Sequence, residues 1–67
     1  MRDWLKEKRL EKGLTMAEMA KKLDISEGYY SRIEDGSRQK DMNVLLALKI
    51  SQALGMSLQE IVDAENA

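Results

Sequence analysis

Two short helices with their own start signals are encoded between Thr15 and Gly36. Thr15 is a good N-cap, and a glutamate three residues later completes a capping box, which predicts a helix over Met16–Leu23. Ser26 gives the same kind of cap to a second helix over Glu27–Asp35, which Gly36 ends. Because so little chain separates them, the two helices can share one interior only by crossing at a steep angle. The apolar side chains that fit this interior are Met19, Ala20, Leu23, Ile25, Tyr30 and Ile33.

Two helices joined in this way form a helix-turn-helix, whose second helix usually enters the major groove of DNA. Over residues 2–62 the chain resembles the lambda-repressor/Cro-like (XRE-type) helix-turn-helix family. This resemblance implies an all-α, compact five-helix DNA-binding domain with the helix-turn-helix at its second and third helices. Asp24 departs from the family, because glycine normally makes the turn there. The residues that carry the resemblance are Leu14, Thr15, Met19, Ala20, Leu23, Ile25, Ser26, Tyr29, Tyr30, Ser31, Ile33, Glu34 and Gly36, with Arg9 before them and Ala53, Leu54, Gly55 and Ser57 after them.

The remaining segments predict three further helices. The first covers residues 1–12 and ends at Gly13, a favourable left-handed C-cap. The fourth is capped by Asp41 or Asn43 and ends at Gly55.

The fifth helix starts at Leu58, behind a third cap at Ser57, and is expected to end at Val62 or Asp63. Residues 63–67 carry no apolar anchor, so we expect the tail, residues 62–67, to fray. Residues 1–67 are therefore interpreted as a single helix-turn-helix domain.

Composition narrows the function classes. The 67 residues contain no cysteine and no histidine, so the usual thiol nucleophile and general base are absent, and so are the common ligands of soft metals. We therefore expect neither an enzyme nor a metal, cofactor or small-molecule ligand. No apolar run is long enough to span a membrane and no signal-peptide pattern is present, which is typical of a cytoplasmic protein.

The net charge of −1 is unfavourable for non-specific binding to nucleic acid. The charges are unevenly distributed, however: residues 1–12 carry five basic and three acidic side chains, and residues 41–67 carry one basic and four acidic. The middle segment, residues 13–40, is balanced at five of each. The acidic excess thus lies away from the expected DNA-binding segment.

The resemblance assigns candidate DNA contacts. Arg32, Glu27 and Ser31 would read base edges, and Arg32 is the strongest candidate because a guanidinium binds guanine through two hydrogen bonds. Gly28 would allow close approach to a base or the backbone. Glu27 could instead repel phosphates, or simply stabilise the start of its helix. The residues expected to contact the DNA backbone are Thr15, Met16, Tyr29, Arg38 and Lys40.

Two of these assignments depart from the family. Met16 replaces the usual glutamine, which donates a hydrogen bond to a phosphate and orients the recognition helix. The loop over residues 37–43 is longer than usual and lacks the frequent proline. Its cations either contact phosphates or are simply solvated.

Arg9 shares the core-facing side of the first helix, which is unusual for a charged residue. The resemblance pairs this arginine with the glutamate near the end of the recognition helix, Glu34. The alternative is a solvated arginine at the helix edge. Trp4, on the same side, is interpreted as a packing residue.

The fourth helix is apolar nearly all round, which indicates burial on two sides. One side is formed by Val44, Ala47, Leu48, Ser51 and Leu54. The other would be covered either by the first and fifth helices or by a second protomer, which would make it a dimer face. That side is formed by Met42, Leu46, Ile50 and Ala53.

Two functions fit these features. The first is sequence-specific binding of double-stranded DNA by a small transcriptional regulator, a repressor that acts as a homodimer on a palindromic operator. The alternative is a protein-interaction module, antitoxin-like or accessory, that keeps the fold without binding DNA. The net negative charge, Glu27, Met16 and the apolar second face of the fourth helix favour the alternative.

Overall fold

The computed structural model describes residues 1–67 and contains five helices and no strand. None of the helices has the length and apolar character needed to cross a membrane. The ranges predicted for the second and third helices are confirmed to the residue. In chain order the helices are α1 (Asp3–Glu11), α2 (Met16–Leu23), α3 (Glu27–Asp35), α4 (Val44–Leu54) and α5 (Leu58–Glu65).

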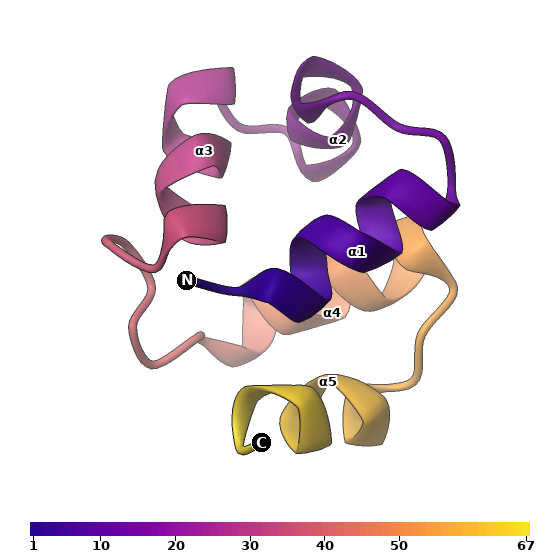
Figure 1. Ribbon diagram of the computed structural model, residues 1–67, viewed down its shortest axis with the longest axis vertical. Coiled ribbons are helices and arrows are strands. Elements are labelled where there is room, and N and C mark those ends of the chain that lie inside the picture. Colours follow the sequence, from indigo (N-terminus) through magenta and orange to yellow (C-terminus); the bar gives the residue numbers. More distant parts are fainter.

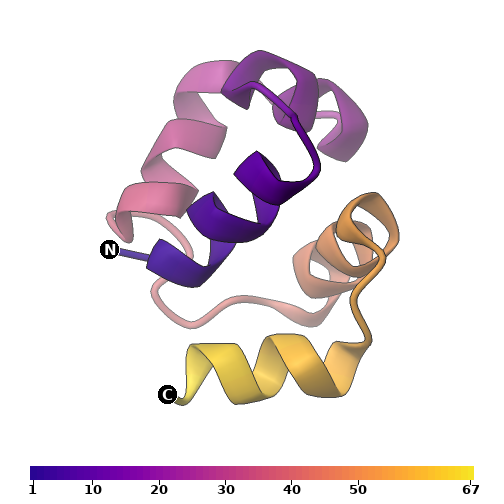
Figure 2. The same ribbon diagram turned by 45° about the vertical axis from the view of Figure 1, so that its right-hand side comes forward.

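The helices form two groups around one interior (Figures 1 and 2). α1, α2 and α3 make the first group, in which α2 and α3 pack closely and α1 lies against α3. α4 packs against α2 from the other side, and α5 packs against α4. In both views the start of the chain lies beside the C-terminal end of α3. This arrangement lets residues before α1 reach the segment that follows the recognition helix.

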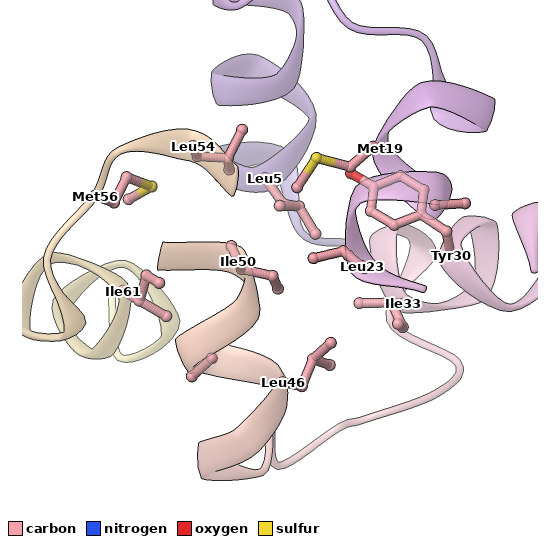
Figure 3. Packing of buried hydrophobic residues seen from close by; sticks show 12 residues of the cluster. Leu5, Met19, Leu23, Tyr30, Ile33, Leu46, Ile50, Leu54, Met56 and Ile61 are labelled. Atoms are coloured by element: carbon pink, nitrogen blue, oxygen red, sulfur yellow. The ribbon is translucent and has the colours of Figure 1, made fainter. Parts of the chain in front are cut away.

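The core draws side chains from every helix (Figure 3). Leu5 of α1 and Leu23 of α2 are fully buried, as are Tyr30 of α3 and Ile50 of α4. Ile61 ties α5 to the same cluster at 1% exposure. Trp4 packs against the cluster as a partly buried residue, as predicted. The remaining core residues are Met19, Ala20, Ile33, Leu46, Ala47, Leu54 and Met56.

Side-chain caps begin four of the five helices. The predicted capping box at Thr15 is present, and the predicted cap at Ser57 also forms a capping box, with Glu60. The backbone N–H of Thr15 donates to the Glu18 carboxylate at 2.9 Å, and this hydrogen bond lowers the pKa of Glu18. Of the two candidate caps for α4, Asn43 is the one used: its side chain accepts from the Leu46 N–H at 2.8 Å.

The side of α4 predicted to form a dimer face points into the core. Leu46 is 7% exposed and Ile50 is fully buried, and Met42 and Ala53 pack against the same cluster. Of the two alternatives for this side, burial within the domain is the one observed, and the dimer face is wrong, because the apolar pattern alone cannot show which side of a helix meets its own domain. The exposed apolar side chains of α4 are instead Val44, Leu45 and Leu48, at 71%, 66% and 40% exposure.

α5 continues beyond its predicted end, to Glu65. The expectation of fraying from residue 62 fails for residues 62–65, because the anchor is polar rather than apolar. The Glu65 carboxylate accepts from the Trp4 indole N–H at 2.8 Å and from Arg2 Nε at 2.9 Å.

A buried ion pair joins α1 to α3. Arg9 and Glu34 are 6% and 1% exposed, and the guanidinium donates to both carboxylate oxygens at 3.0 and 3.1 Å. A third guanidinium hydrogen bond reaches the Leu14 carbonyl at 2.8 Å, at the entry to α2. The predicted pairing is thus confirmed, and it fixes α1, the first turn and the recognition helix relative to one another.

The hydroxyl of Tyr30 lies beside this pair without a hydrogen bond. Burial, together with the neighbouring Glu34 carboxylate, raises the pKa of Tyr30 well above its ordinary value. The phenol therefore stays neutral and adds no second negative charge to the buried site.

We expect Arg9→Met to lower the free energy of unfolding by about 3–5 kcal/mol, because it strands the buried Glu34 carboxylate. The double substitution Arg9→Met with Glu34→Leu should be less destabilising than Arg9→Met alone, since no charge is left unpaired. Urea denaturation followed by circular dichroism measures both. Lys6→Met, at an exposed position of the same helix, is the control and should change stability by about 0.5 kcal/mol or less. A loss of similar size for Arg9→Met and Lys6→Met would contradict the structural importance of the pair.

Candidate nucleic-acid interface

A left-handed residue sets the turn between α2 and α3. Asp24 has φ 59° and ψ 45°, the left-handed conformation, at the turn position where the family normally has glycine. The N–H of the next residue, Ile25, donates to the Ala20 carbonyl at 3.0 Å and closes the end of α2. Ser26 then starts α3 by accepting from the Tyr29 N–H at 3.1 Å. These local bonds fix where α3 begins.

One side of α3 packs into the core, and the opposite side is exposed to solvent. Tyr30, Ile33 and Glu34 are buried, whereas Gly28 and Arg32 are exposed. Gly28 and Arg32 lie four residues apart, so they share one helix face. This outward face is where a helix-turn-helix contacts base edges.

The other candidate base contacts flank this face. Glu27 is exposed in the first turn of α3, and Ser31 is half-buried. A carboxylate at the first turn is favoured by the helix dipole.

Gly28 has no structural reason to be glycine. A Cβ built at this position would meet nothing within 4 Å, and its φ is not in the left-handed region. Glycine inside a helix is destabilising by about 0.5–1 kcal/mol relative to alanine. A ligand that comes close to the helix backbone would explain a glycine at this position, whereas the packing of the protein alone does not.

One carboxylate shares the outward face with Arg32. Asp35 is exposed and accepts from the Ser37 N–H at 2.7 Å, which lowers the pKa of Asp35 and keeps it ionised. Its hydrogen bond directs it toward the end of the helix. Arg32 is the only cation of α3.

The loop after α3 carries two more cations, of which Lys40 also lines hollows beside α5. The first residues of the loop stay close to the end of the recognition helix, because the Arg38 N–H donates to the Arg32 carbonyl at 3.1 Å. The side chains of Arg38 and Lys40 are exposed. Both are thus free to contact phosphates, the role that the resemblance implies for them.

The predicted backbone contact Tyr29 is half-buried and is joined to the loop. Its hydroxyl accepts from the side-chain amide of Gln39 at 2.8 Å, so its own hydrogen remains available to a phosphate oxygen. Thr15 is exposed, and its hydroxyl oxygen accepts from the Glu18 N–H at 3.1 Å. Met16 is half-buried and packs against the core, so its side chain supports α2 and donates no hydrogen bond.

Sequence reasoning missed Arg2 and Gln39. Arg2 is 7% exposed and bonds to the end of α3 and to the loop. Gln39 has φ 55° and links Tyr29 to the start of α4, where its side-chain oxygen accepts from the Asn43 N–H at 3.2 Å. No local pattern marks either residue, since their partners depend on tertiary packing.

The profile of the family described as Helix-turn-helix matches residues 5–61. The chain belongs to the helix-turn-helix family. The match covers the whole of α2 and α3 and confirms both the expected family and the all-α fold.

A relative from Bacillus subtilis (strain 168) bears the name "Uncharacterized HTH-type transcriptional regulator YqaF". It is 47% identical over 55 residues, which cover 82% of this helix-turn-helix chain and 70% of the relative. No solved structure matches the chain.

We expect Gly28→Ala to raise the free energy of unfolding of this helix-turn-helix protein by about 0.5–1 kcal/mol, since alanine fits the open space and favours the helix. Gly36→Ala is the matched comparison at the other end of α3. It should destabilise the protein, because Gly36 has φ 88°, a left-handed conformation that is strained for alanine. Thermal and urea denaturation measure both. A destabilising Gly28→Ala would show that Gly28 has a structural role in the free protein.

Proposed function

We propose that this protein binds double-stranded DNA sequence-specifically and regulates transcription, as a repressor that occupies a palindromic operator as a homodimer and blocks polymerase sterically. The activity is one of binding rather than catalysis. Binding to DNA would place the protein beside that DNA, in the cytoplasm. Membership of the helix-turn-helix family and the name of the relative support the DNA-binding and regulatory parts of this proposal.

The observation that carries the proposal is the outward position of Arg32 on α3. Its side chain is exposed while the opposite side of the helix is locked into the core by Tyr30, Ile33 and the Glu34 ion pair. A guanidinium presented by a fixed helix can bind the O6 and N7 acceptors of guanine through two hydrogen bonds. Gly28, on the same face, would let the DNA come close to the helix backbone.

The backbone contacts follow from the surrounding segments. Arg38 and Lys40 would neutralise phosphates beside the groove, and the hydroxyls of Tyr29 and Thr15 would donate to phosphate oxygens. Met16 would make only an apolar contact. Glu27 would either accept from a cytosine amino group or repel phosphates that approach in the wrong register.

One such module makes few contacts, so tight binding at physiological salt needs two. The exposed apolar face of α4 suits a second copy. Val44, Leu45 and Leu48 are uncharged, as is Gln52 beside them, so two copies of this face would meet without like-charge repulsion.

α5 extends this surface. Leu58 and Val62 are 39% and 47% exposed, and Val62 lines a hollow between α4 and α5 together with apolar Met42 and Ala47 and with polar side chains that include Lys40, Asp41 and Glu65. The five exposed apolar side chains of the two helices present roughly 400–500 Å², within the usual range of the largest patch on a protein surface. Twice this area is close to the roughly 1,000 Å² that a specific interface needs. We therefore propose a weak dimer that DNA binding completes.

Selection from a random duplex library should enrich an inverted repeat with half-sites about 10 base pairs apart, because a two-fold dimer presents two recognition helices about one helical turn apart. Arg32→Ala should then weaken binding to the selected duplex by at least tenfold, through the loss of about 1–3 kcal/mol of base recognition. Fluorescence anisotropy at several salt concentrations measures both.

Arg32→Lys is the matched control for this experiment. It keeps the charge but not the planar pair of donors, so it should bind random duplex as the wild type does and lose preference for the selected one. If no duplex is enriched even at low salt, the protein-interaction reading replaces the proposal. Equal binding of selected and random duplex by the wild type would contradict sequence specificity.

The dimer has its own test. We expect the wild type to show a concentration-dependent monomer–dimer equilibrium in analytical ultracentrifugation and Leu45→Glu to remain monomeric, because a carboxylate within the face would be desolvated. Leu10→Glu is the matched control, since Leu10 is 56% exposed on α1, outside the face. A wild type that stays monomeric, both free and on the inverted repeat, would remove this face as the dimer interface.

A further inference from the structure

Arg2 is buried although it is charged and lies at the start of the chain. Its Nη1 donates to the carbonyls of Ile33 at 2.7 Å and Arg38 at 3.2 Å, and its Nη2 donates to the carbonyl of Gln39. Its own backbone N–H donates to the Glu34 carbonyl at 2.8 Å. Arg2 thus binds both the last turn of α3 and the beginning of the following loop.

Glu65 completes this site from α5. Arg2 Nε donates to both oxygens of its carboxylate, at 3.0 and 2.9 Å, and the Trp4 indole N–H donates to one of them. Although burial raises it, the pKa of Glu65 is lowered overall by these hydrogen bonds, so the carboxylate stays ionised beside the guanidinium. The ion pair compensates the charge of Arg2 and fixes the plane in which its other donors point.

The loop depends on such contacts for its shape. Residues 36–43 contain no helix or strand, and Gln39 occupies the left-handed region at φ 55°. The carbonyls of Arg38 and Gln39 point inward to the guanidinium, while the side chains of Arg38 and Lys40 are exposed. Fixing the carbonyls inward limits where the neighbouring side chains can point.

We propose that Arg2 is a positioning residue for DNA binding: it holds the 36–40 loop so that Arg38 and Lys40 are placed against phosphates beside the recognition helix. Arg2 itself touches no DNA. The inference rests on the proposed function, because the two cations contact phosphates only if the protein binds DNA. The Gln39 side-chain amide donates to the Tyr29 hydroxyl, so the loop held by Arg2 is also joined to the recognition helix.

Lysine cannot replace arginine at this site. The guanidinium has five N–H donors in one plane, and here they reach three carbonyls and one carboxylate. An ammonium has three donors and no fixed plane, so Arg2→Lys keeps the charge while it releases part of the loop. This makes Arg2→Lys the sharpest variant for a test.

We expect Arg2→Lys to lower affinity for the selected duplex by about eightfold per lost phosphate contact at about 0.1 M salt, and to make the slope of log K against log salt shallower by about 1–2. In the background Arg38→Ala with Lys40→Ala, the same substitution should cause no further loss, because the groups through which Arg2 acts are gone. Base preference at the position read by Arg32 should stay unchanged.

Ser57→Ala is the control for simple destabilisation, because it removes the cap of α5 without touching the loop. It should leave the salt slope as in the wild type. A second measurement needs no DNA: in Arg2→Lys the amides of residues 37–41 should exchange with solvent faster, while those of Leu23 and Ile50 in the core are unchanged.

The outcomes separate the two proposals. If the wild type binds no duplex, the proposed function fails and this role of Arg2 fails with it. If the wild type binds and Arg2→Lys keeps its salt slope, or if Arg2→Lys weakens binding as much in the double-alanine background, only the positioning role is overturned. Unchanged amide exchange over 37–41 would also overturn it, since the loop would then hold its shape without the guanidinium.

Discussion

The orientation of the recognition helix depends on one buried ion pair. Arg9 and Glu34 are almost wholly excluded from solvent and bonded through two parallel contacts, and Arg9 also holds the Leu14 carbonyl at the entry to α2. In a 67-residue chain the core is thin, so packing alone determines helix angles weakly. A planar, two-contact pair adds a directional constraint that apolar contacts lack. It sets α3 against α1, and the outward position of Arg32 follows from that setting.

Features encoded by neighbours in sequence were predictable. The caps at Thr15, Ser26 and Ser57, the left-handed turn at Asp24 and the end at Gly36 need only residues within one helical turn, and all are present. These local signals determine where a helix starts and stops with little dependence on its surroundings. The Arg9–Glu34 pair is not local; it was predictable because the family resemblance supplied the partner.

Features that depend on distant partners were not predictable. α4 is apolar nearly all round, so its sequence could not show that Leu46 and Ile50 face the core and Leu45 faces solvent. The end of α5 lacked an apolar anchor, yet Glu65 is held by Arg2, 63 positions away in the sequence. For the candidate site, the outward face of α3 followed from helical periodicity, whereas the loop geometry did not, because Arg2 and Gln39 shape it through tertiary contacts.

The placement of charges explains how a chain of net charge −1 can present a DNA-binding surface. Two of its arginines and two of its glutamates are consumed in the Arg9–Glu34 and Arg2–Glu65 pairs, so they contribute little field outside the protein. The carboxylates of Glu18 and Glu60 are engaged in capping boxes at helix starts. Such a distribution gives a weak long-range attraction to DNA of any sequence, because non-specific binding scales with the phosphates neutralised. Recognition by this surface must therefore rest on a few well-placed contacts, which makes the rigidity of α3 and of its following loop more important than the total charge.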